Sequence, residues 1–173
     1  PAYFPQEIYD YCSLKYNERT FFHCLAVVAY AIENPCVMDP EFASAVAICA
    51  LCHDLLEDTD ATIEEIAEYS GLDEEFLAET LDALTKRDEE SYNEYITRLK
   101  NEGNEVSYVV KLADMKDHLK RTDTLTDRLK EKYWKALPVL FTVVQTNFLS
   151  TSASMGTSPI SFIVKALYVR KLS

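Results

Sequence analysis

Apolar residues recur along most of this chain at the three- and four-residue intervals that place them on one face of an α-helix. Signals for helix ends separate these stretches: Thr62 with Glu65 forms a capping box, Gly71 is suited to end a helix, and Asp73 to begin the next. The pattern predicts an all-α fold. Its helices are expected at residues 5–16, 20–34, 39–57, 62–70, 73–85, 91–102, 104–121, 125–148 and 159–171.

The segment 104–121 carries two different stripes at helical spacing. One is apolar and consists of Tyr108, Leu112, Met115 and Leu119. The other, at steps of three, four and three residues, is polar and consists of Lys111, Asp114, His118 and Arg121. We therefore expect this helix to pack on one face and to supply candidate functional groups on another.

Length and composition fit the same prediction. A chain of 173 residues suits one domain with a sizeable core, here residues 1–173. With 48% hydrophobic residues, three glycines and six prolines, the composition favours a helical bundle over a glycine-punctuated β fold. The five cysteines are an odd number without disulfide-like spacing, which indicates a reducing, cytoplasmic compartment.

The formal net charge of −12 narrows the range of ligands. A nucleic-acid polymer needs basic stripes on its partner, so we expect none here. A small phosphorylated substrate is compatible with this charge, because a bound cation and a few local basic residues can dominate a pocket.

No charged residue occurs from Ala136 to Val164, which raises the alternative of a membrane span. Pro138 and the polar segments at 150–154 and 156–159 divide this stretch into pieces too short and too polar to span. We therefore expect no membrane contact and a buried or interface helix, through which the chain can form a homo-oligomer.

The most distinctive motif is His-Asp-Leu-Leu-Glu-Asp at residues 53–58, which follows an apolar run. The chain has three histidines, and the two others lie where companions to this motif would be needed: one on an earlier apolar helix and one close after Asp114. Imidazole nitrogens and carboxylate oxygens suit a divalent ion that keeps positions open for water and substrate. The expected metal ligands are His23, His53, Asp54 and Asp114.

Two further acids follow the ligands by one helical turn. Glu57 and Asp58 are placed to orient or deprotonate a metal-bound water. Taken singly, each of these residues is more simply explained by ordinary burial or by a solvated helix end. The combination is stronger, because three segments fit one site and all the histidines take part.

These residues resemble the signature of HD-domain metal-dependent phosphohydrolases. The fuller pattern is similar to the hydrolase domain of RelA/SpoT-type (p)ppGpp hydrolases, and closer to small stand-alone proteins of that superfamily. The resemblance rests on residues 53–59 (His-Asp-Leu-Leu-Glu-Asp-Thr), 84–86 (Leu-Thr-Lys), 91–99 (Ser-Tyr-x-x-Tyr-Ile-x-Arg-Leu), 110–114 (Val-Lys-Leu-Ala-Asp) and 128–133 (Arg-Leu-x-x-Lys-Tyr). It covers a core of about residues 17–140 and leaves a C-terminal helical tail of about residues 141–173 outside.

The resemblance implies a single HD-domain helical bundle, a bound divalent ion such as Mn²⁺, and a small nucleotide substrate. The implied reaction removes the 3′-pyrophosphate from a guanosine nucleotide. Contacts to the nucleotide or its phosphates are implied for Lys111, Thr85, Lys86 and Tyr92.

The chain departs from this family at two places. The hydrolases usually read Lys-Leu-Ala-Asp-x-x-His-Asn, whereas Asp117-His118 stands at the last two positions here. His118 is expected either to touch substrate phosphate or a base, or to pair with Asp114 or Asp117. Of the family's basic stretch before the first histidine, Arg19 remains, and we expect it to stack on the base.

Two other functions stay open, and one other use of the histidine motif is disfavoured. The His118 difference favours, as a runner-up, a nucleoside 5′-monophosphate phosphatase of the wider HD class. A non-catalytic module that binds metal and nucleotide is a third possibility, against which retention of Glu57 and Asp58 argues. The run from Cys49 to His53 also matches the Cys-x-x-Cys-His pattern of haem attachment, but the two cysteines on an apolar helix are better explained as small core residues.

Overall fold

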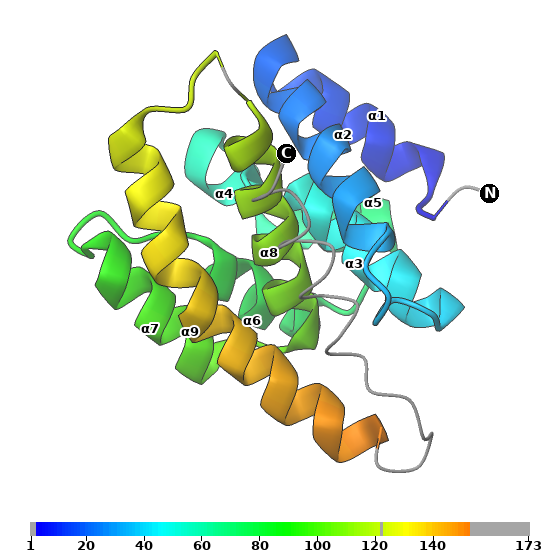
Figure 1. The fold of residues 1–173 in the computed structure, drawn as a ribbon. Helices are drawn as coiled ribbons and strands as arrows, with labels where there is room; N and C mark the ends of the chain where they lie inside the picture. The colour runs from blue at the N-terminus through cyan, green and yellow to red at the C-terminus, as the bar shows by residue number, and fades with distance from the viewer. Residues whose placement is uncertain (1–2, 122, 153–173) are drawn as a thin grey trace.

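The computed structural model describes residues 3–121 and 123–152, and over these residues it is helical, without strands (Figure 1). The all-α prediction is confirmed, and a helical bundle is consistent with the arrangement. The helices are α1 (Gln6–Lys15), α2 (Glu18–Ile32), α3 (Pro40–Cys52), α4 (Leu55–Asp58), α5 (Ile63–Ser70), α6 (Glu74–Leu84), α7 (Tyr92–Glu102), α8 (Glu105–Lys120) and α9 (Asp127–Ser152). The helix expected at residues 159–171 lies outside the described residues.

Local side-chain caps fix most helix beginnings. Thr62 and Glu65 form the predicted capping box of α5, and Gly71 ends that helix in the left-handed conformation, with φ of 73°. Asp73 accepts a hydrogen bond from the backbone of Phe76 at the start of α6, as its position predicts. The helix boundaries around α5 and α6 therefore follow from local sequence.

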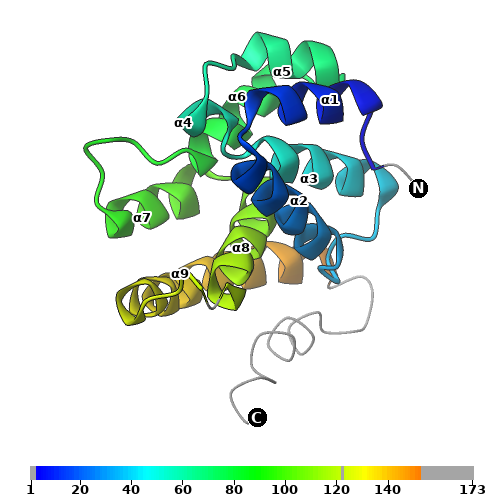
Figure 2. The ribbon, with the colours of Figure 1, turned by 90° about the horizontal axis from the view of Figure 1, so that it is seen from above.

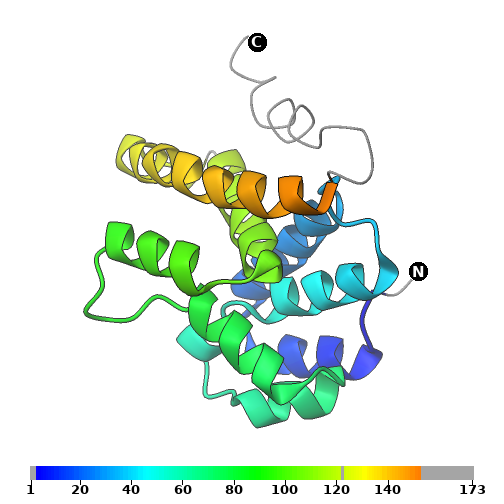
Figure 3. The same cartoon turned by 90° about the horizontal axis from the view of Figure 1, so that it is seen from below.

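The helices form layers, with α8 near the centre. Viewed from above, α1 and α5 lie on one side and α9 on the opposite side, with α2, α3 and α8 between them (Figure 2). From below, α9 crosses α8 and runs beside α7 (Figure 3). In both views α8 lies between α9 on one side and α2 and α3 on the other.

Two apolar clusters meet at α8. Val106, Val109, Val110 and Ala113 of α8 pack in the cluster formed with α1, α2, α3, α5 and α6. The predicted apolar stripe belongs to the second cluster, shared with α7 and α9: Tyr108, Leu112 and Met115 are buried, and Leu119 packs against them. Lys111, Asp114 and His118 lie on a third face of α8 that belongs to neither cluster. The fold therefore keeps these polar groups together.

The segment expected as one helix at 39–57 is interrupted. Helix α3 ends at Cys52, and α4 begins only at Leu55. His53 Nδ1 donates to the carbonyl oxygen of Ala50 at 2.8 Å. The imidazole thus satisfies a carbonyl group in the last turn of α3. Asp54, with φ of −98° and ψ of −1°, occupies the sparsely populated bridge region that active-site residues often adopt. The interruption thus falls on the two motif residues expected to bind metal.

Helix α9 continues through Pro138, as the helix expected at residues 125–148 does. The hydroxyl of Thr142 donates to the Pro138 carbonyl at 2.9 Å within the same helix. Over residues 3–121 and 123–152, no helix combines the length and the apolar character needed to cross a membrane. The uncharged segment expected to form a buried or interface helix lies largely beyond the described side chains.

Candidate metal centre

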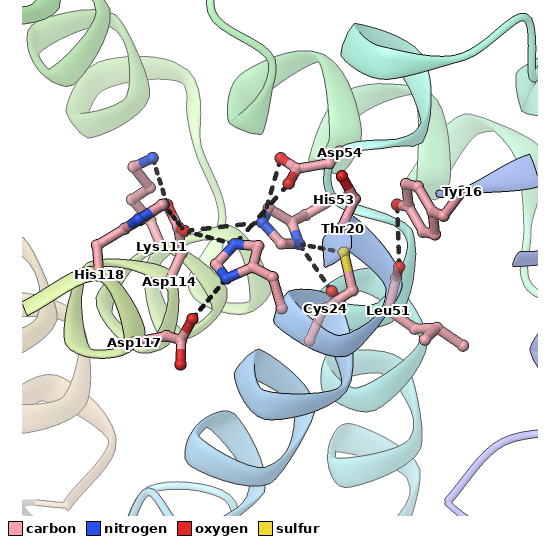
Figure 4. A network of polar contacts seen from close by, with 12 residues as sticks. Tyr16, Thr20, Cys24, Leu51, His53, Asp54, Lys111, Asp114, Asp117 and His118 are labelled. Carbon is pink, nitrogen blue, oxygen red and sulfur yellow. Dashed lines mark hydrogen bonds and ion pairs between the residues drawn. The ribbon is translucent and has the colours of Figure 1, made fainter. Parts of the chain in front are cut away.

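The four predicted metal ligands come from three parts of the fold, and Figure 4 labels His53, Asp54 and Asp114 among them. His23 lies on α2, His53 and Asp54 lie at the junction of α3 and α4, and Asp114 lies on α8. His23 Nε2 is 3.1 Å from Asp114 Oδ1 and 3.8 Å from Asp54 Oδ2. His53 Nε2 is 3.2 Å from Asp54 Oδ1 and 3.8 Å from Asp114 Oδ1. Two imidazoles and two carboxylates therefore share one small volume.

The His53 ring presents an unpaired nitrogen to this volume. Its Nδ1 donates to the Ala50 carbonyl oxygen, which leaves Nε2 of the neutral ring as an acceptor. Nε2 is buried and has no hydrogen-bond partner within the described part of the chain. An acceptor that faces the carboxylates of Asp54 and Asp114 is unfavourable unless a cation lies between them. The site thus has the polarity of a cation site.

His23 is oriented from the opposite side of its ring. Its Nδ1 lies 2.6 Å from Asp117 Oδ2, and Arg121 Nε donates to the same oxygen at 2.6 Å. A carboxylate behind a ligating histidine fixes the tautomer in which Nε2 carries the lone pair. Burial lowers the pKa of His23, but the hydrogen bonds to Asp114 and Asp117 outweigh it and raise the pKa to about 9. An ion binding at Nε2 would therefore displace a proton at neutral pH.

Asp114 is held as a carboxylate by a buried lysine. Lys111 Nζ donates to Asp114 Oδ2 at 2.7 Å, which leaves Oδ1 directed at the histidines. Burial alone would raise the pKa of Asp114, but the Lys111 ammonium and the hydrogen bonds from His118 and His23 lower it well below its usual value. One oxygen of Asp114 is therefore engaged and the other remains available as a ligand.

This donor set fits a divalent ion. Two ligands that bond an ion at about 2.1 Å and at right angles lie about 3.0 Å apart, close to the shorter separations seen here. Two sets of three ligand atoms lie within 4.8 Å of one another: His23, His53 and Asp54, and His23, Asp114 and His118. Nitrogen and oxygen donors of this kind suit Mn²⁺, Fe²⁺, Co²⁺ or Zn²⁺.

His118 closes one side of the cluster. Its Nε2 lies 3.1 Å from Asp114 Oδ1, so of the pairings expected for His118 the structure has the one with Asp114. Its ring stacks on Tyr133 of α9, with ring centroids 5.5 Å apart and an interplanar angle of 11°. The His118–Tyr133 stack is the wall between two cavities, because both residues line each of them.

The first cavity has a volume of about 270 Å³ and is rich in charge. Three lysines line it: Lys86, Lys111 and Lys132. Burial and the nearby Lys111 lower the pKa of Lys132, and the charge of Asp114 offsets this only in part. The buried hydroxyl of Tyr92, which has no hydrogen-bond partner among the described residues, also lines this cavity. These groups suit an anionic ligand such as a phosphate.

Glu57 and Asp58 line the same cavity, beside the cluster. Burial raises the pKa of each carboxyl group, and the charge of Asp54 raises it further. A carboxylate whose pKa lies above its usual value is a better proton acceptor near neutral pH. Both residues therefore lie beside the cluster, each with a raised carboxyl pKa.

The second cavity, of about 340 Å³, lies on the other side of the His118–Tyr133 stack. Besides residues of the metal cluster and the stack, Arg19, Thr20, Arg121 and Thr124 line it with polar groups, and Leu129 gives an apolar wall. Arg19 thus reaches the site, at a distance from the lysines, in surroundings that suit a base or sugar.

Thr85 is the one predicted contact that lines neither cavity. Its hydroxyl donates to the Leu81 carbonyl oxygen at 2.7 Å, within the last turn of α6. Conversely, the sequence did not assign roles to Asp117, Lys132 or Tyr133. The Arg-Leu-x-x-Lys-Tyr segment did mark the last two as part of the resemblance. Asp117 was marked as a departure from the family pattern and as a possible partner of His118, but not as a partner of His23.

No protein-family model matches this chain, and a search of curated protein sequences finds no significant match.

Proposed function

We propose that this protein is a metal-dependent phosphohydrolase acting on a small nucleotide, with a (p)ppGpp 3′-pyrophosphohydrolase-like reaction as the leading candidate. One observation carries the proposal: the buried, unpartnered Nε2 of His53 faces two carboxylates beside a cavity lined by three lysines. The first feature calls for a cation, and the second for an anion that this cation can help to bind.

The ligands proposed are His23, His53, Asp54 and Asp114, and Mn²⁺ is the ion that the resemblance implies. When bound, such an ion polarises a phosphoryl oxygen and lowers the pKa of bound water. Lys111 and Lys86 hold the phosphate groups in the lysine-lined cavity, where the hydroxyl of Tyr92 donates a further hydrogen bond. The nucleoside occupies the cavity lined by Arg19 and Thr20.

Glu57 and Asp58 position the attacking water and accept its proton. The water oxygen bonds to phosphorus while the bond from phosphorus to the sugar oxygen breaks, and the sugar oxygen takes up the proton that the carboxylate accepted from the water. The raised pKa of both carboxyl groups supports this assignment, because a general base works best when its pKa approaches the ambient pH.

A nucleoside 5′-monophosphate phosphatase is the second candidate. The observation in its favour is His118, which directs Nε2 at Asp114 where the resembling hydrolases offer an asparagine amide to the nucleotide. A substrate that needs no such amide fits this arrangement equally well.

Release of phosphate and pyrophosphate from a nucleotide panel with Mn²⁺ tests the proposal. The panel includes ppGpp, deoxynucleoside monophosphates and cyclic nucleotides. Pyrophosphate from ppGpp is the expected result, and phosphate from monophosphates would establish the second candidate instead. Asp54→Ala should abolish either activity, whereas Asp10→Ala, which removes an exposed acid on α1, should not. Mn²⁺ binding with no turnover of any nucleotide would contradict the proposal and indicate a binding module.

A further inference from the structure

His118 lies as close to the shared oxygen of Asp114 as the proposed metal ligand His23 does. Its Nε2 lies 3.1 Å from Asp114 Oδ1, the same distance that separates this oxygen from His23 Nε2. All three described histidines thus direct Nε2 at one carboxylate oxygen, with His53 at 3.8 Å. The second oxygen of Asp114 is occupied by Lys111.

The two sets of candidate ligand atoms share His23, whose Nε2 faces both Asp54 and Asp114, so one ion can join the two sets. An imidazole nitrogen has a single lone pair and bonds one ion. His23 cannot serve a second ion through Nδ1, since this nitrogen is engaged by Asp117. His118, if it binds metal, therefore binds the ion that His53 and Asp54 also bind.

The His118 ring is held in place from outside the cluster. Its stack on Tyr133 is nearly parallel, and its centroid lies 4.8 Å from that of His23. The side chain keeps this orientation although it is 39% exposed. A ligand fixed by packing loses little freedom when it binds.

We propose that His118 is a fifth protein ligand to the ion at the centre formed by His23, His53, Asp54 and Asp114. The inference rests on the proposed metal site and changes its chemistry. Three imidazoles and two carboxylates make a nitrogen-rich set, which favours Co²⁺ and Ni²⁺ over Mn²⁺ more strongly than two imidazoles do. A six-coordinate ion would then keep one position for water or for a phosphate oxygen.

Titration of Co²⁺ into the chelator-stripped full chain tests this inference without any substrate. The measured quantities are the dissociation constant and the visible d–d absorption of the bound ion. We expect His118→Asn to weaken Co²⁺ binding by at least about tenfold, the least that loss of an outer-shell partner typically costs. The absorption band should shift because the ligand set changes.

His118→Gln separates ligation from orientation. A glutamine amide can still donate a hydrogen bond to Asp114 but is a poor ligand for Co²⁺. We expect this variant to resemble His118→Asn, and circular dichroism to show both folded. Lys120→Ala is the control on the same turn of α8, because Lys120 points to the ring of Tyr30, 4.4 Å away, and should leave binding unchanged.

Wild-type affinity and an unshifted band in either His118 variant would overturn the inference while leaving the metal site intact. A wild-type chain that binds no Co²⁺ would overturn the proposed metal site itself. The two failures are therefore distinguishable.

Discussion

Asp117 offers the sharpest test of how the centre is built, since it touches a ligand and not the ion. Its carboxylate accepts from His23 Nδ1 at 2.6 Å and from Arg121 Nε at 2.6 Å. A hydrogen bond to a charged group contributes about 1.5–3 kcal/mol. At about 1.4 kcal/mol per tenfold, its loss weakens metal binding about 10- to 100-fold, the range typical of outer-shell partners. We expect Asp117→Asn to fall in this range.

The pH of the assay decides how much of this loss is seen. Asp117 also helps to raise the pKa of His23 to about 9, so it favours the proton that competes with the ion. Below that pH, wild-type affinity should fall with decreasing pH, and the fall should be shallower in Asp117→Asn. The full loss is therefore expected near pH 9, and a smaller one at pH 7.

Calorimetric titration of Mn²⁺ under argon at both pH values measures the effect. Arg121→Gln is the matched control, since it keeps the carboxylate and removes a partly exposed ion pair worth no more than about 1 kcal/mol, or about fivefold. Equal affinities at pH 9 for wild type and a folded Asp117→Asn variant would refute the positioning role of Asp117.

Three further predictions follow from single contacts. Glu57→Gln should slow turnover by about 10²- to 10⁴-fold with Mn²⁺ affinity unchanged, and loss of metal would show that its role is misassigned. Glu90 has a pKa of about 2, mainly through its hydrogen bond with Arg98, against an ordinary value of 4.5. Because this folded-state pKa lies below the unfolded value, the stability it provides is present above about pH 4.5 and is lost as the pH falls towards 2. Glu90→Gln should flatten the pH dependence of urea unfolding in that window, and an unchanged slope would contradict this. Gly103→Ala should destabilise the chain by about 1–3 kcal/mol in the same assay, because the new Cβ would lie 2.5 Å from the Leu99 carbonyl oxygen. A change below about 0.5 kcal/mol would show that this contact relaxes freely.

Helix positions were predictable where local signals decide them. The capping box of Thr62 and Glu65, the left-handed Gly71 and the apolar stripe of α8 are properties of short segments, so spacing in the sequence was sufficient. The interruption at His53 and Asp54 was not predictable in this way. It depends on an imidazole that bonds the Ala50 carbonyl oxygen, and helical periodicity does not detect a break of two residues.

In the candidate site too, the residues of the sequence motif were predictable, whereas contacts that depend on helix packing were not. Residue type and motif spacing pointed to His23, His53, Asp54 and Asp114, which the fold brings together. The bond from His23 to Asp117 was missed because the two residues lie 94 positions apart, and the His118–Tyr133 stack because it depends on how α9 packs on α8. A carboxylate near the end of α8 acquires its role only when α2 places His23 against it.

Binding of Mn²⁺ to the chelator-stripped full chain decides whether the cluster of His23, His53, Asp54 and Asp114 is a metal site. Equilibrium dialysis with metal analysis gives the number of ions bound per chain. We expect one ion per wild-type chain and none in a folded Asp54→Ala variant at the same free Mn²⁺. No bound Mn²⁺ in the wild type, or the same binding in both proteins, would contradict this expectation.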